Sequence, residues 1–254
     1  MKAKKKYGQN FLKNDTIIKD IVSLFDSSDY DTIMEIGPGR GALTKYLSQK
    51  KGKLICFEID TDMKKYLDQY ESDKCTINYC DILNVNLDEY QNNSLTYVIG
   101  NLPYYITTPI IEKFINSSLM PYKMIFMVQK EVGERICASP GNKAYGYLTL
   151  LVKYYYDAQI KIDVPRNNFD PIPNVDSVII ELTRNKRPIS SEFNKYKIFL
   201  QRLFKQKRKT LKNNLLTEEW SEIQNILVKY HLSNNVRAEE LSEEIIEEIF
   251  CKLY

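Results

Sequence analysis

The 254-residue sequence has little of what metal and nucleophile chemistry needs. It contains one histidine, His231, and no CxxC pair, so a zinc or other soft-metal site lacks both ligands and spacing. No serine or cysteine motif stands beside His231, which argues against a catalytic triad. We therefore expect no metal site and expect the five cysteines to be reduced thiols in the core: Cys56, Cys75, Cys80, Cys137 and Cys251.

Long apolar runs are also missing. No stretch of 18 apolar residues occurs, and the basic N-terminus is not followed by the apolar segment of a signal peptide. These absences predict a cytoplasmic protein with no membrane partner. A monomer is the default expectation, because no apolar seam for a second copy is evident. The length predicts one large domain and one small one.

Charge is distributed unevenly along the chain, although the net charge is only +3. Residues 1–13 carry five lysines and no acid, and residues 184–214 carry eleven lysines or arginines against one glutamate. Residues 218–248 carry nine glutamates against two basic residues. Such runs are typical either of solvated helix faces or of surfaces that bind a polyanion.

Seven short apolar or β-branched runs alternate with helix-like segments, as in an α/β sheet. They lie at residues 32–37, 53–59, 75–81, 95–102, 124–129, 153–163 and 175–183. The first five suit parallel crossovers, whereas a Pro- and Asn-rich stretch separates the last two, which we expect to pair antiparallel. Three amphipathic helices follow in residues 192–253, at 193–204, 221–232 and 238–253. The predicted domains are a basic arm (1–13), an α/β domain (14–184) and a helical domain (188–254).

A glycine-rich loop follows the first predicted strand. Gly37, Gly39 and Gly41 alternate there, which permits a tight turn and close approach of the backbone to a ligand. The pattern is neither GxGxxG nor a phosphate-binding loop with Lys-Ser/Thr. A purely structural turn is the alternative.

Acidic residues end the next two predicted strands. Glu58 stands seventeen residues after Gly41, where a carboxylate can accept hydrogen bonds from ribose hydroxyls, and Asp81 is placed to accept from an adenine amine. The alternative for Glu58 is a helix cap. Together with the glycine loop, these acids predict an adenosine-bearing ligand across the carboxyl edge of the sheet.

The fourth strand ends in the tetrapeptide Asn101-Leu102-Pro103-Tyr104. An aromatic amine is a poor nucleophile, and acceptors that pull on its N–H bonds favour a pyramidal nitrogen. Asn101 and the Leu102 carbonyl, fixed by Pro103, can be those acceptors, while Tyr104 offers a face on which an extruded base can stack. An ordinary turn is the alternative.

With this tetrapeptide and an ExGxGxG loop, the chain resembles the ribosomal RNA adenine dimethyltransferases, which use S-adenosylmethionine. The matching segments extend over roughly residues 7–216 and are 9–12, 35–44, 58–60, Asp81, 101–104, 129–132, 143–146, 169–177 and 207–215. The resemblance implies a class I methyltransferase domain with a seven-stranded Rossmann-like sheet and a small helical RNA-binding domain. It also implies dimethylation of two adjacent adenosines near the 3′ end of small-subunit (16S) rRNA, coupled to ribosome biogenesis, with the small subunit as partner.

Residue roles follow from the same resemblance. Asn10 and Leu12 would close over the cofactor, while Gly37, Gly39, Glu58, Asp81 and Asn101 would contact it. Asn101, Leu102, Pro103 and Tyr104 would form the catalytic motif, and Phe169 would cover the second face of the target adenine. Phe169 has an alternative as a loop aromatic packed on the core. Tyr105 departs from the Asn or His common in the family, which affects the shape of the pocket.

Two branches of the family compete. The housekeeping KsgA or RsmA type carries the FxPxPxVDS run, the KAYG segment and the basic RKTLxNxL helix, as this chain does. The Erm type, which modifies the large subunit, usually has Asn where Asp176 stands. We favour the housekeeping branch; a non-catalytic ribosome-assembly or transcription factor and a DNA adenine methyltransferase are further alternatives.

Overall fold

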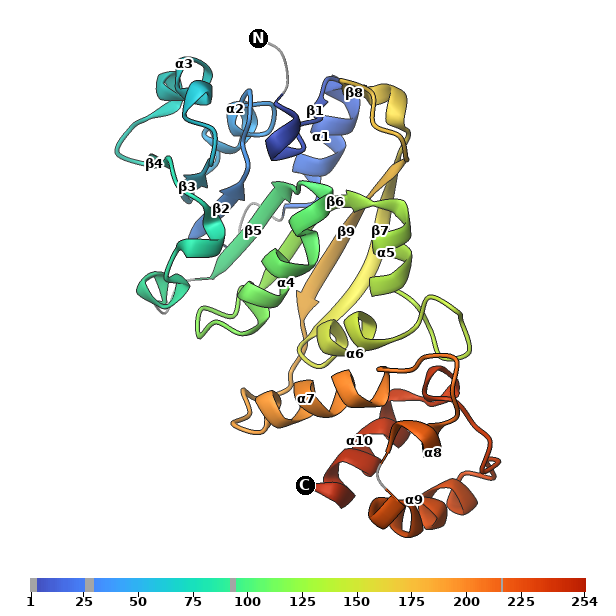
Figure 1. The fold of residues 1–254 in the computed structure, drawn as a ribbon. Helices are drawn as coiled ribbons and strands as arrows, with labels where there is room; N and C mark the ends of the chain where they lie inside the picture. Colours follow the sequence, from blue (N-terminus) through green and yellow to red (C-terminus); the bar gives the residue numbers. More distant parts are fainter. Residues whose placement is uncertain (1–3, 26–29, 92–94, 216) are drawn as a thin grey trace. The chain divides into compact units, whose positions relative to one another are not determined.

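Contacts within the computed structural model divide the chain into two compact units, which Figure 1 draws in one frame. The structure describes residues 4–25, 30–91, 95–215 and 217–254. The first unit extends to Gly133 and includes Tyr156–Asn185; the second contains Glu134–Tyr155 and Lys186–Tyr254. In the described residues, no helix combines the length and the apolar character needed to span a membrane.

A seven-stranded mixed sheet forms the centre of the first unit, with strand order β4-β3-β2-β5-β6-β9-β7. The strands are β2 (Thr32–Ile36), β3 (Lys53–Phe57), β4 (Cys75–Asn78), β5 (Thr96–Asn101), β6 (Lys123–Gln129), β7 (Tyr156–Val164) and β9 (Ser177–Arg184). The first five are parallel, while β9 runs antiparallel to both β6 and β7. This arrangement confirms the predicted α/β class and the antiparallel pairing of the last two strands.

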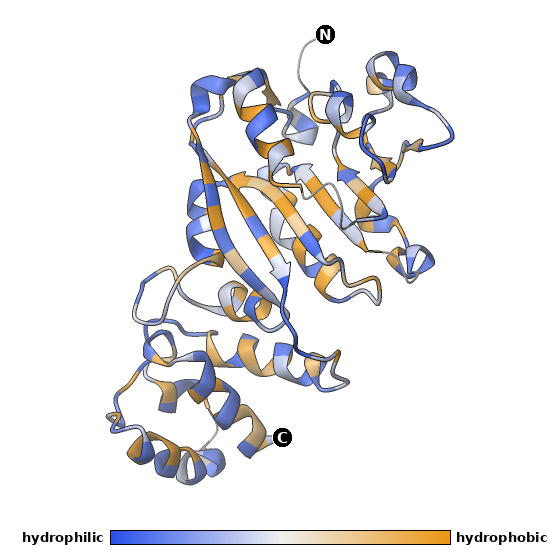
Figure 2. Ribbon diagram, turned by 180° about the vertical axis from the view of Figure 1, so that it is seen from behind, coloured by the Kyte–Doolittle hydropathy of each residue, from blue (hydrophilic) through white to orange (hydrophobic). Residues whose placement is uncertain are grey.

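Both faces of the sheet are covered near its middle, where the strands are mostly buried and apolar (Figure 2). Because side chains alternate along a strand, Ile125 of β6 joins the cluster that includes Ile18 and Ile21 of α1, whereas Phe126 packs on Phe114 of α4. The helices of this unit are α1 (Asp15–Ser23), α2 (Thr44–Leu47), α3 (Lys64–Leu67) and α4 (Thr107–Ile115). Helix α5 (Lys130–Ile136) crosses the boundary between the units.

Short 3-10 turns fill the connections of the first unit. They are η1 (Lys5–Tyr7), η2 (Thr61–Met63), η3 (Asp68–Tyr70), η4 (Ile82–Asn84), η5 (Leu87–Tyr90), η6 (Tyr104–Ile106) and η7 (Arg166–Asn168). Asp60 and Asp81 each begin one of these turns by accepting a backbone hydrogen bond two residues later. These hydrogen bonds hold the side chains of Asp60, which follows β3, and Asp81, which follows β4, in fixed positions.

A second, two-stranded sheet joins β1 (Phe11–Leu12) to β8 (Phe169–Asp170). The strands are antiparallel, with Phe11 opposite Asp170 and Leu12 opposite Phe169. Just beyond this pairing, the amide of Lys13 donates to the carbonyl of Asn168 at 2.9 Å. This sheet, which the sequence analysis does not predict, fixes the N-terminal arm (residues 4–13) against the first unit.

All the regular elements in the described residues of the second unit are helices. Its helices are α6 (Tyr147–Lys153), α7 (Phe193–Leu203), α8 (Leu211–Asn214), α9 (Thr217–Lys229), η8 (Ala238–Glu240) and α10 (Glu243–Leu253). The sequence analysis predicts three helices here from periodicity, whereas α8 lies in the basic RKTLxNxL segment that only the family resemblance indicates as helical. It also predicts one continuous helix over η8 and α10, but Ser242 begins α10 by accepting a hydrogen bond from the amide of Ile245, so the two are separate.

Aromatic packing explains why residues 134–155 group with the C-terminal residues, whereas the predicted α/β domain contained all of 14–184. Tyr154 lies 5.0 Å from Phe193 and 4.7 Å from Tyr196 between ring centroids. Tyr155 lies 4.8 Å from Phe193. These rings supply much of the core of the second unit.

The cysteines are only partly core residues. Cys56 and Cys75 are buried, as predicted, and all five thiols are free. Cys251 is exposed on α10, so the prediction of a core thiol is wrong there. It follows Phe250 on that helix, and Phe250 takes the buried position.

Candidate functional site

A cavity of about 330 Å³ lies in the first unit, where β2, β3 and β5 end. It is lined by residues of the arm (7–13), the glycine loop (37–43), Glu58 and Ile59, and the tetrapeptide 101–104, together with Glu35, Met127 and Asp170. Its size suits a nucleoside-sized ligand, and its position at the carboxyl ends of parallel strands is where α/β sheets bind ligands.

The glycine loop borders this cavity, and its three glycines adopt the left-handed backbone conformation. Gly37, Gly39 and Gly41 have φ of +67°, +57° and +82°. A Cβ on Gly39 would lie 3.1 Å from the Phe11 ring, so a larger residue there would displace the arm. Glycine is thus needed both for the turn and for the close approach of the arm.

Glu58 presents a nearly buried carboxylate to the cavity. It is 4% exposed, and its two oxygens accept from the amides of Gly39 at 2.9 Å and Asp60 at 2.8 Å. Burial raises the pKa of Glu58, and these two hydrogen bonds oppose that rise. Because each carboxylate oxygen has two acceptor positions, Glu58 retains capacity for ligand hydroxyls.

A second buried carboxyl, Glu35 on β2, also lines the cavity. It is 1% exposed, and its Oε2 accepts from Thr44 Oγ1 at 2.8 Å. Burial raises the pKa of Glu35 to about 8, although the hydrogen bonds from Thr44 and Cys56 lower it in part. The sequence analysis quotes Glu35 in the loop motif without giving it a role, because nothing in a single sequence shows how deeply a carboxyl is buried.

The tetrapeptide 101–104 borders the cavity at the end of β5. Asn101 Nδ2 donates to the carbonyl of Asn10 at 2.9 Å, so this side chain joins the arm to the tetrapeptide. The amide of Leu102 donates to the carbonyl of Met127 at 3.2 Å, which fixes the backbone of the motif on β6. Five predicted site residues, Asn10, Leu12, Gly37, Gly39 and Glu58, therefore line one cavity with the tetrapeptide.

The Tyr104 ring is held by its hydroxyl, which lies 2.7 Å from Ser177 Oγ. Burial raises the pKa of Tyr104. Its neighbour Tyr105 is 60% exposed and passes close to the backbone of Gly8. The residue that departs from the family pattern thus lies against the arm and does not line the cavity.

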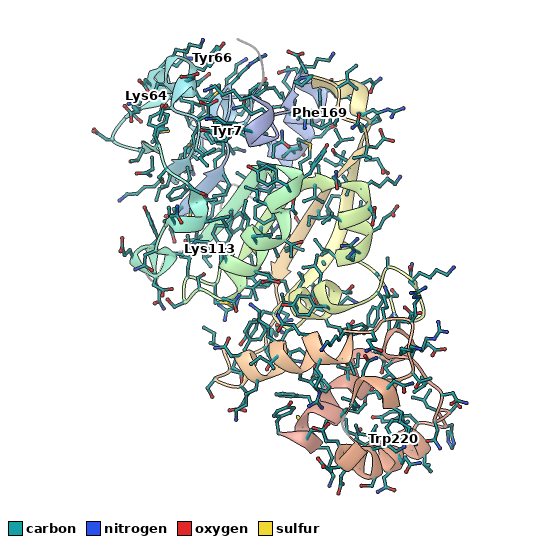
Figure 3. The ribbon with its side chains drawn as sticks, in the orientation of Figure 1. Tyr7, Lys64, Tyr66, Lys113, Phe169 and Trp220 are labelled. Atoms are coloured by element: carbon teal, nitrogen blue, oxygen red, sulfur yellow. The ribbon has the colours of Figure 1, made fainter. Side chains whose placement is uncertain are left out.

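Two predicted site residues do not line the cavity. Asp81 uses one carboxylate oxygen to accept from the amide of Leu83 at 2.9 Å, which caps η4. Phe169 is 1% exposed and packs in the core cluster with Leu12 and Ile179; Figure 3 marks its position. The roles of Asp81 and Phe169 stay predictions, and the stacking role requires the Phe169 ring to leave this core.

Arg40 and Asp170 line the cavity although the sequence analysis gave them no role. The Arg40 guanidinium lies 4.2 Å from the centre of the Phe11 ring and 3.4 Å from the Asp170 carboxylate. A cation over an aromatic face is favourable, so Arg40 supports the arm from the glycine loop. Residue type alone could not reveal this contact, because the three residues are far apart in sequence.

In the second unit, a basic loop (residues 204–210) connects α7 to α8. Lys205, Arg208 and Lys209 are exposed on it, while Lys207 contacts the Lys143 carbonyl and lies 3.7 Å from Glu239. Three neighbouring cations open to solvent form a surface that suits phosphates. Across the ranges that the structure describes, no three His, Cys, Asp or Glu side chains gather as metal ligands would.

Comparison with known proteins gives a consistent result. The family model described as ribosomal RNA adenine dimethylase matches residues 1–253. A Fusobacterium nucleatum protein named ribosomal RNA small subunit methyltransferase A is 45% identical, over 95% of this chain and 94% of its own. A Mycoplasmopsis pulmonis protein of the same name is 40% identical over the whole of both chains.

Solved structures share the fold. A dimethyladenosine transferase from Plasmodium falciparum matches with a TM-score of 0.77 and 25% identity, over 94% of this chain and 95% of its own. The 23S rRNA methyltransferase ErmE matches with a TM-score of 0.75 and 19% identity, over 96% and 99%. The second likeness concerns the fold alone.

Proposed function

Because the chain belongs to the ribosomal RNA adenine dimethylase family, we propose that it dimethylates two adjacent adenosines near the 3′ end of small-subunit (16S) rRNA. It is an S-adenosylmethionine-dependent methyltransferase. One observation carries the proposal: the tetrapeptide 101–104 borders the same cavity as the glycine loop and Glu58. This supports the proposal, because the motif expected to accept hydrogen bonds from an amine and the residues expected to hold an adenosine line one cavity.

The cavity residues fit the cofactor. Gly37 and Gly39 give backbone that a bulky ligand can approach, and Glu58 offers acceptor positions for ribose hydroxyls. Asn10 and Leu12 of the arm line the same cavity. When bound, the cofactor supplies a methyl group on a positively charged sulfur, which is a strong electrophile.

This chain prepares the amine that attacks that methyl group. The Asn101 side-chain oxygen and the Leu102 carbonyl accept hydrogen bonds from the adenine 6-amino group and favour a pyramidal nitrogen. Tyr104 stacks on the base, and Ser177 keeps the ring in place. Once the N–C bond forms, the methylated nitrogen is positively charged and loses its proton to water, so catalysis depends mainly on positioning and desolvation.

The RNA partner fits the basic loop. Exposed Lys205, Arg208 and Lys209 neutralise phosphates and position the RNA without reading its sequence. Recognition of looped or single-stranded RNA is expected, because base edges in an A-form helix are hard to reach.

The small-subunit substrate is favoured over the large-subunit alternative. The bacterial relatives carry the small-subunit name, whereas the likeness to ErmE extends to the fold only. Asp176, where the Erm branch usually has Asn, uses its carboxylate to accept from the amide of Arg166 at 2.9 Å. This carboxylate organises the start of η7 and does not line the cavity, so the names of the relatives carry the small-subunit assignment.

The test is methyl transfer from labelled S-adenosylmethionine to small subunits and to large-subunit RNA, both from cells that lack the enzyme. Nuclease digestion then identifies the product. Dimethyladenosine on the small subunit alone supports the proposal. Label on large-subunit RNA overturns it in favour of the Erm reading, and no label on either leaves a non-catalytic assembly factor.

A further inference from the structure

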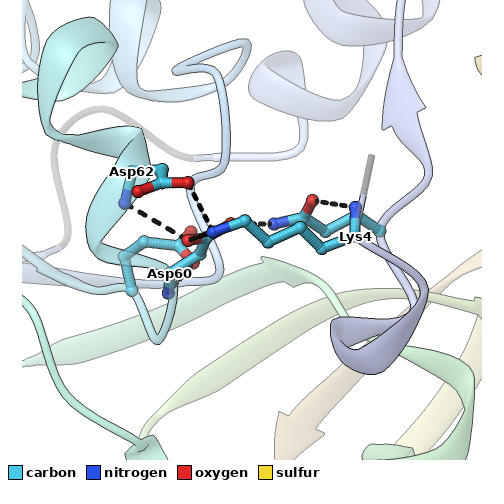
Figure 4. A network of polar contacts seen from close by, with 5 residues as sticks. Lys4, Asp60 and Asp62 are labelled. Carbon is cyan, nitrogen blue, oxygen red and sulfur yellow. Dashed lines mark hydrogen bonds and ion pairs between the residues drawn. The ribbon is translucent and has the colours of Figure 1, made fainter. Parts of the chain in front are cut away.

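Lys4 connects the N-terminal arm to two aspartates that follow β3 (Figure 4). Its ammonium nitrogen lies 2.6 Å from Asp60 Oδ1 and 2.5 Å from Asp62 Oδ2. Gln9 of the same arm donates from Nε2 to Asp60 Oδ2 at 2.8 Å, and its Oε1 accepts from the Lys4 amide at 2.8 Å. Lys4 and Gln9, at the two ends of residues 4–9, are thus both bound to the Asp60 carboxylate.

This contact differs from an ordinary surface ion pair, because the Asp60 side chain is only 1% exposed. A buried carboxylate needs partners to stay ionised. Burial opposes ionisation of Asp60, but the hydrogen bonds from Lys4 and Gln9 outweigh it and lower its pKa. Removing Lys4 leaves a buried charge without its cation, which disfavours the bound position of the arm.

The arm so held forms one wall of the cofactor cavity. Residues 7–13 line it directly, and Figure 3 marks Tyr7 at the start of this stretch. Asp60 follows Glu58 by two residues, and its amide donates to Glu58 Oε1. One aspartate therefore connects the cavity wall formed by the arm to the carboxylate proposed to bind the ribose.

We infer that Lys4 is a positioning residue for the cofactor: its contacts with Asp60 and Asp62 hold the arm over the cavity. This inference rests on the proposed function. It separates Lys4 from the other basic residues of the arm, because the sequence analysis treats this basic run as a whole, either as a solvated face or as a surface that binds a polyanion. A ligand that requires the arm in place binds more weakly in proportion to the fraction of molecules in which the arm is released.

The experiment measures binding of S-adenosylhomocysteine to the full chain by titration calorimetry, in the absence of RNA. Lys4→Gln removes the cation while keeping a long side chain, and Lys4→Arg keeps the charge. Lys6→Gln is the matched control, because the Lys6 ammonium packs on the Tyr7 ring at 4.4 Å rather than on the aspartates. We expect Lys4→Gln to raise Kd about tenfold and Lys4→Arg and Lys6→Gln to change it less than about threefold.

A variant of the partner residue tests the same contact at a position where a substitution is not expected to disturb folding. Asp62 is 53% exposed, so Asp62→Asn weakens the same contact from an exposed position. It should raise Kd in the same direction as Lys4→Gln, and the double variant should add little. Far-ultraviolet circular dichroism and thermal unfolding confirm that each variant is folded.

A second readout distinguishes positioning from RNA binding. If Lys4 contacted a phosphate, Lys4→Gln would reduce the slope of log K for RNA against log salt by about 0.7 to 0.9. The inference predicts an unchanged slope and a higher KM for S-adenosylmethionine at constant kcat. An unchanged Kd for S-adenosylhomocysteine in Lys4→Gln overturns the inference, whereas a wild-type chain that does not bind S-adenosylhomocysteine overturns the proposed function itself.

Discussion

The hydroxyl of Tyr104 and the hydroxyl of Ser177 lie 2.7 Å apart, which joins the tetrapeptide after β5 to the first residue of β9. Ser177 is fully buried, while Tyr104 is half-buried and borders the cavity. The hydrogen bond holds the Tyr104 ring by its hydroxyl and leaves the face of the ring free of this contact. The aromatic surface therefore stays available to a base while the ring cannot swing away.

Tyr104→Phe tests this bond. It keeps the ring but leaves the buried Ser177 hydroxyl without its partner, which costs about 1 kcal/mol of stability. We expect methyl transfer to fall roughly threefold to tenfold, and Ser177→Ala to give a similar loss, measured as single-turnover rates. Tyr104→Ala also removes stacking and should lose a further ~10- to 100-fold. Equal rates for the Phe and Ala variants would show that the ring does not contact the base.

Asn101→Ala tests the proposed acceptor. We expect the single-turnover rate at saturating cofactor to fall about 100- to 1000-fold, as for other groups that stabilise a transition state. Loss of the hydrogen bond to Asn10 should also weaken cofactor binding slightly. The exposed Asn84→Ala is the control. Retained small-subunit assembly in cells expressing Asn101→Ala would indicate a role separate from methyl transfer.

Neutralising Lys205, Arg208 and Lys209 to Gln tests the basic loop. RNA affinity should fall, and the slope of log K against log salt should decrease by about 2 to 3, because three phosphate contacts are lost. Binding of S-adenosylhomocysteine should not change.

A matched triple variant controls for total charge. It neutralises three lysines of the second unit that already pair with glutamates, namely Lys195, Lys229 and Lys252. We expect its salt slope to stay close to that of the wild type. An equal loss in both triple variants would mean that net charge, rather than the basic loop, determines RNA binding.

Glu35 predicts an unusual pH dependence of stability. Its pKa of about 8 in the folded protein exceeds the ordinary value of 4.5, so the folded state holds this proton more tightly than the unfolded state. The free energy of unfolding should therefore fall by up to about 1.4 kcal/mol per pH unit as pH rises from about 4.5 to 8. Glu35→Gln should remove this part of the slope, measured by urea unfolding without cofactor. Parallel pH profiles for the two proteins would contradict it.

Gly100 shows where the sheet cannot accept a side chain. A Cβ there would lie 2.7 Å from the carbonyl oxygen of Ile36 on β2. We expect Gly100→Ala to reduce the free energy of unfolding by about 2 to 3 kcal/mol. Gly141→Ala is the comparison, since a Cβ at Gly141 meets no atom within 4 Å and only its φ of +83° is strained, at about 1 kcal/mol. Similar losses in urea unfolding would argue against a clash at Gly100.

The sheet could be predicted from the sequence because each strand is a local apolar run, such as Thr32–Ile36 or Thr96–Asn101. The glycine loop and Glu58 could be predicted for a related reason. In a parallel sheet the carboxyl ends of adjacent strands share one edge, so residues that follow β2 and β3 must approach one another.

The remaining features depend on contacts that leave no local pattern. The β1–β8 sheet is made of two-residue strands, which are too short for periodicity, and Lys4 and Asp60 are 56 residues apart. Phe169 shows another limit: its residue type suits stacking, but the sequence does not reveal that the packing of the first unit buries its ring. Helix α8 shows no periodic pattern of its own, because four residues span little more than one turn, and only the family resemblance indicates a helix there.

The β1–β8 sheet also leads us to expect that cofactor binding and RNA binding are coupled. Phe11 and Leu12 belong to the wall of the cofactor cavity, and their partners Asp170 and Phe169 belong to the segment expected to meet the target base. Whatever stabilises one strand stabilises the other through shared backbone hydrogen bonds. Thermodynamic reciprocity then requires that the cofactor change RNA affinity by the same factor by which RNA changes cofactor affinity. We expect bound S-adenosylmethionine to raise the affinity for RNA, and bound RNA to raise the affinity for S-adenosylmethionine. After methyl transfer, dissociation of S-adenosylhomocysteine should then weaken the binding of the methylated RNA.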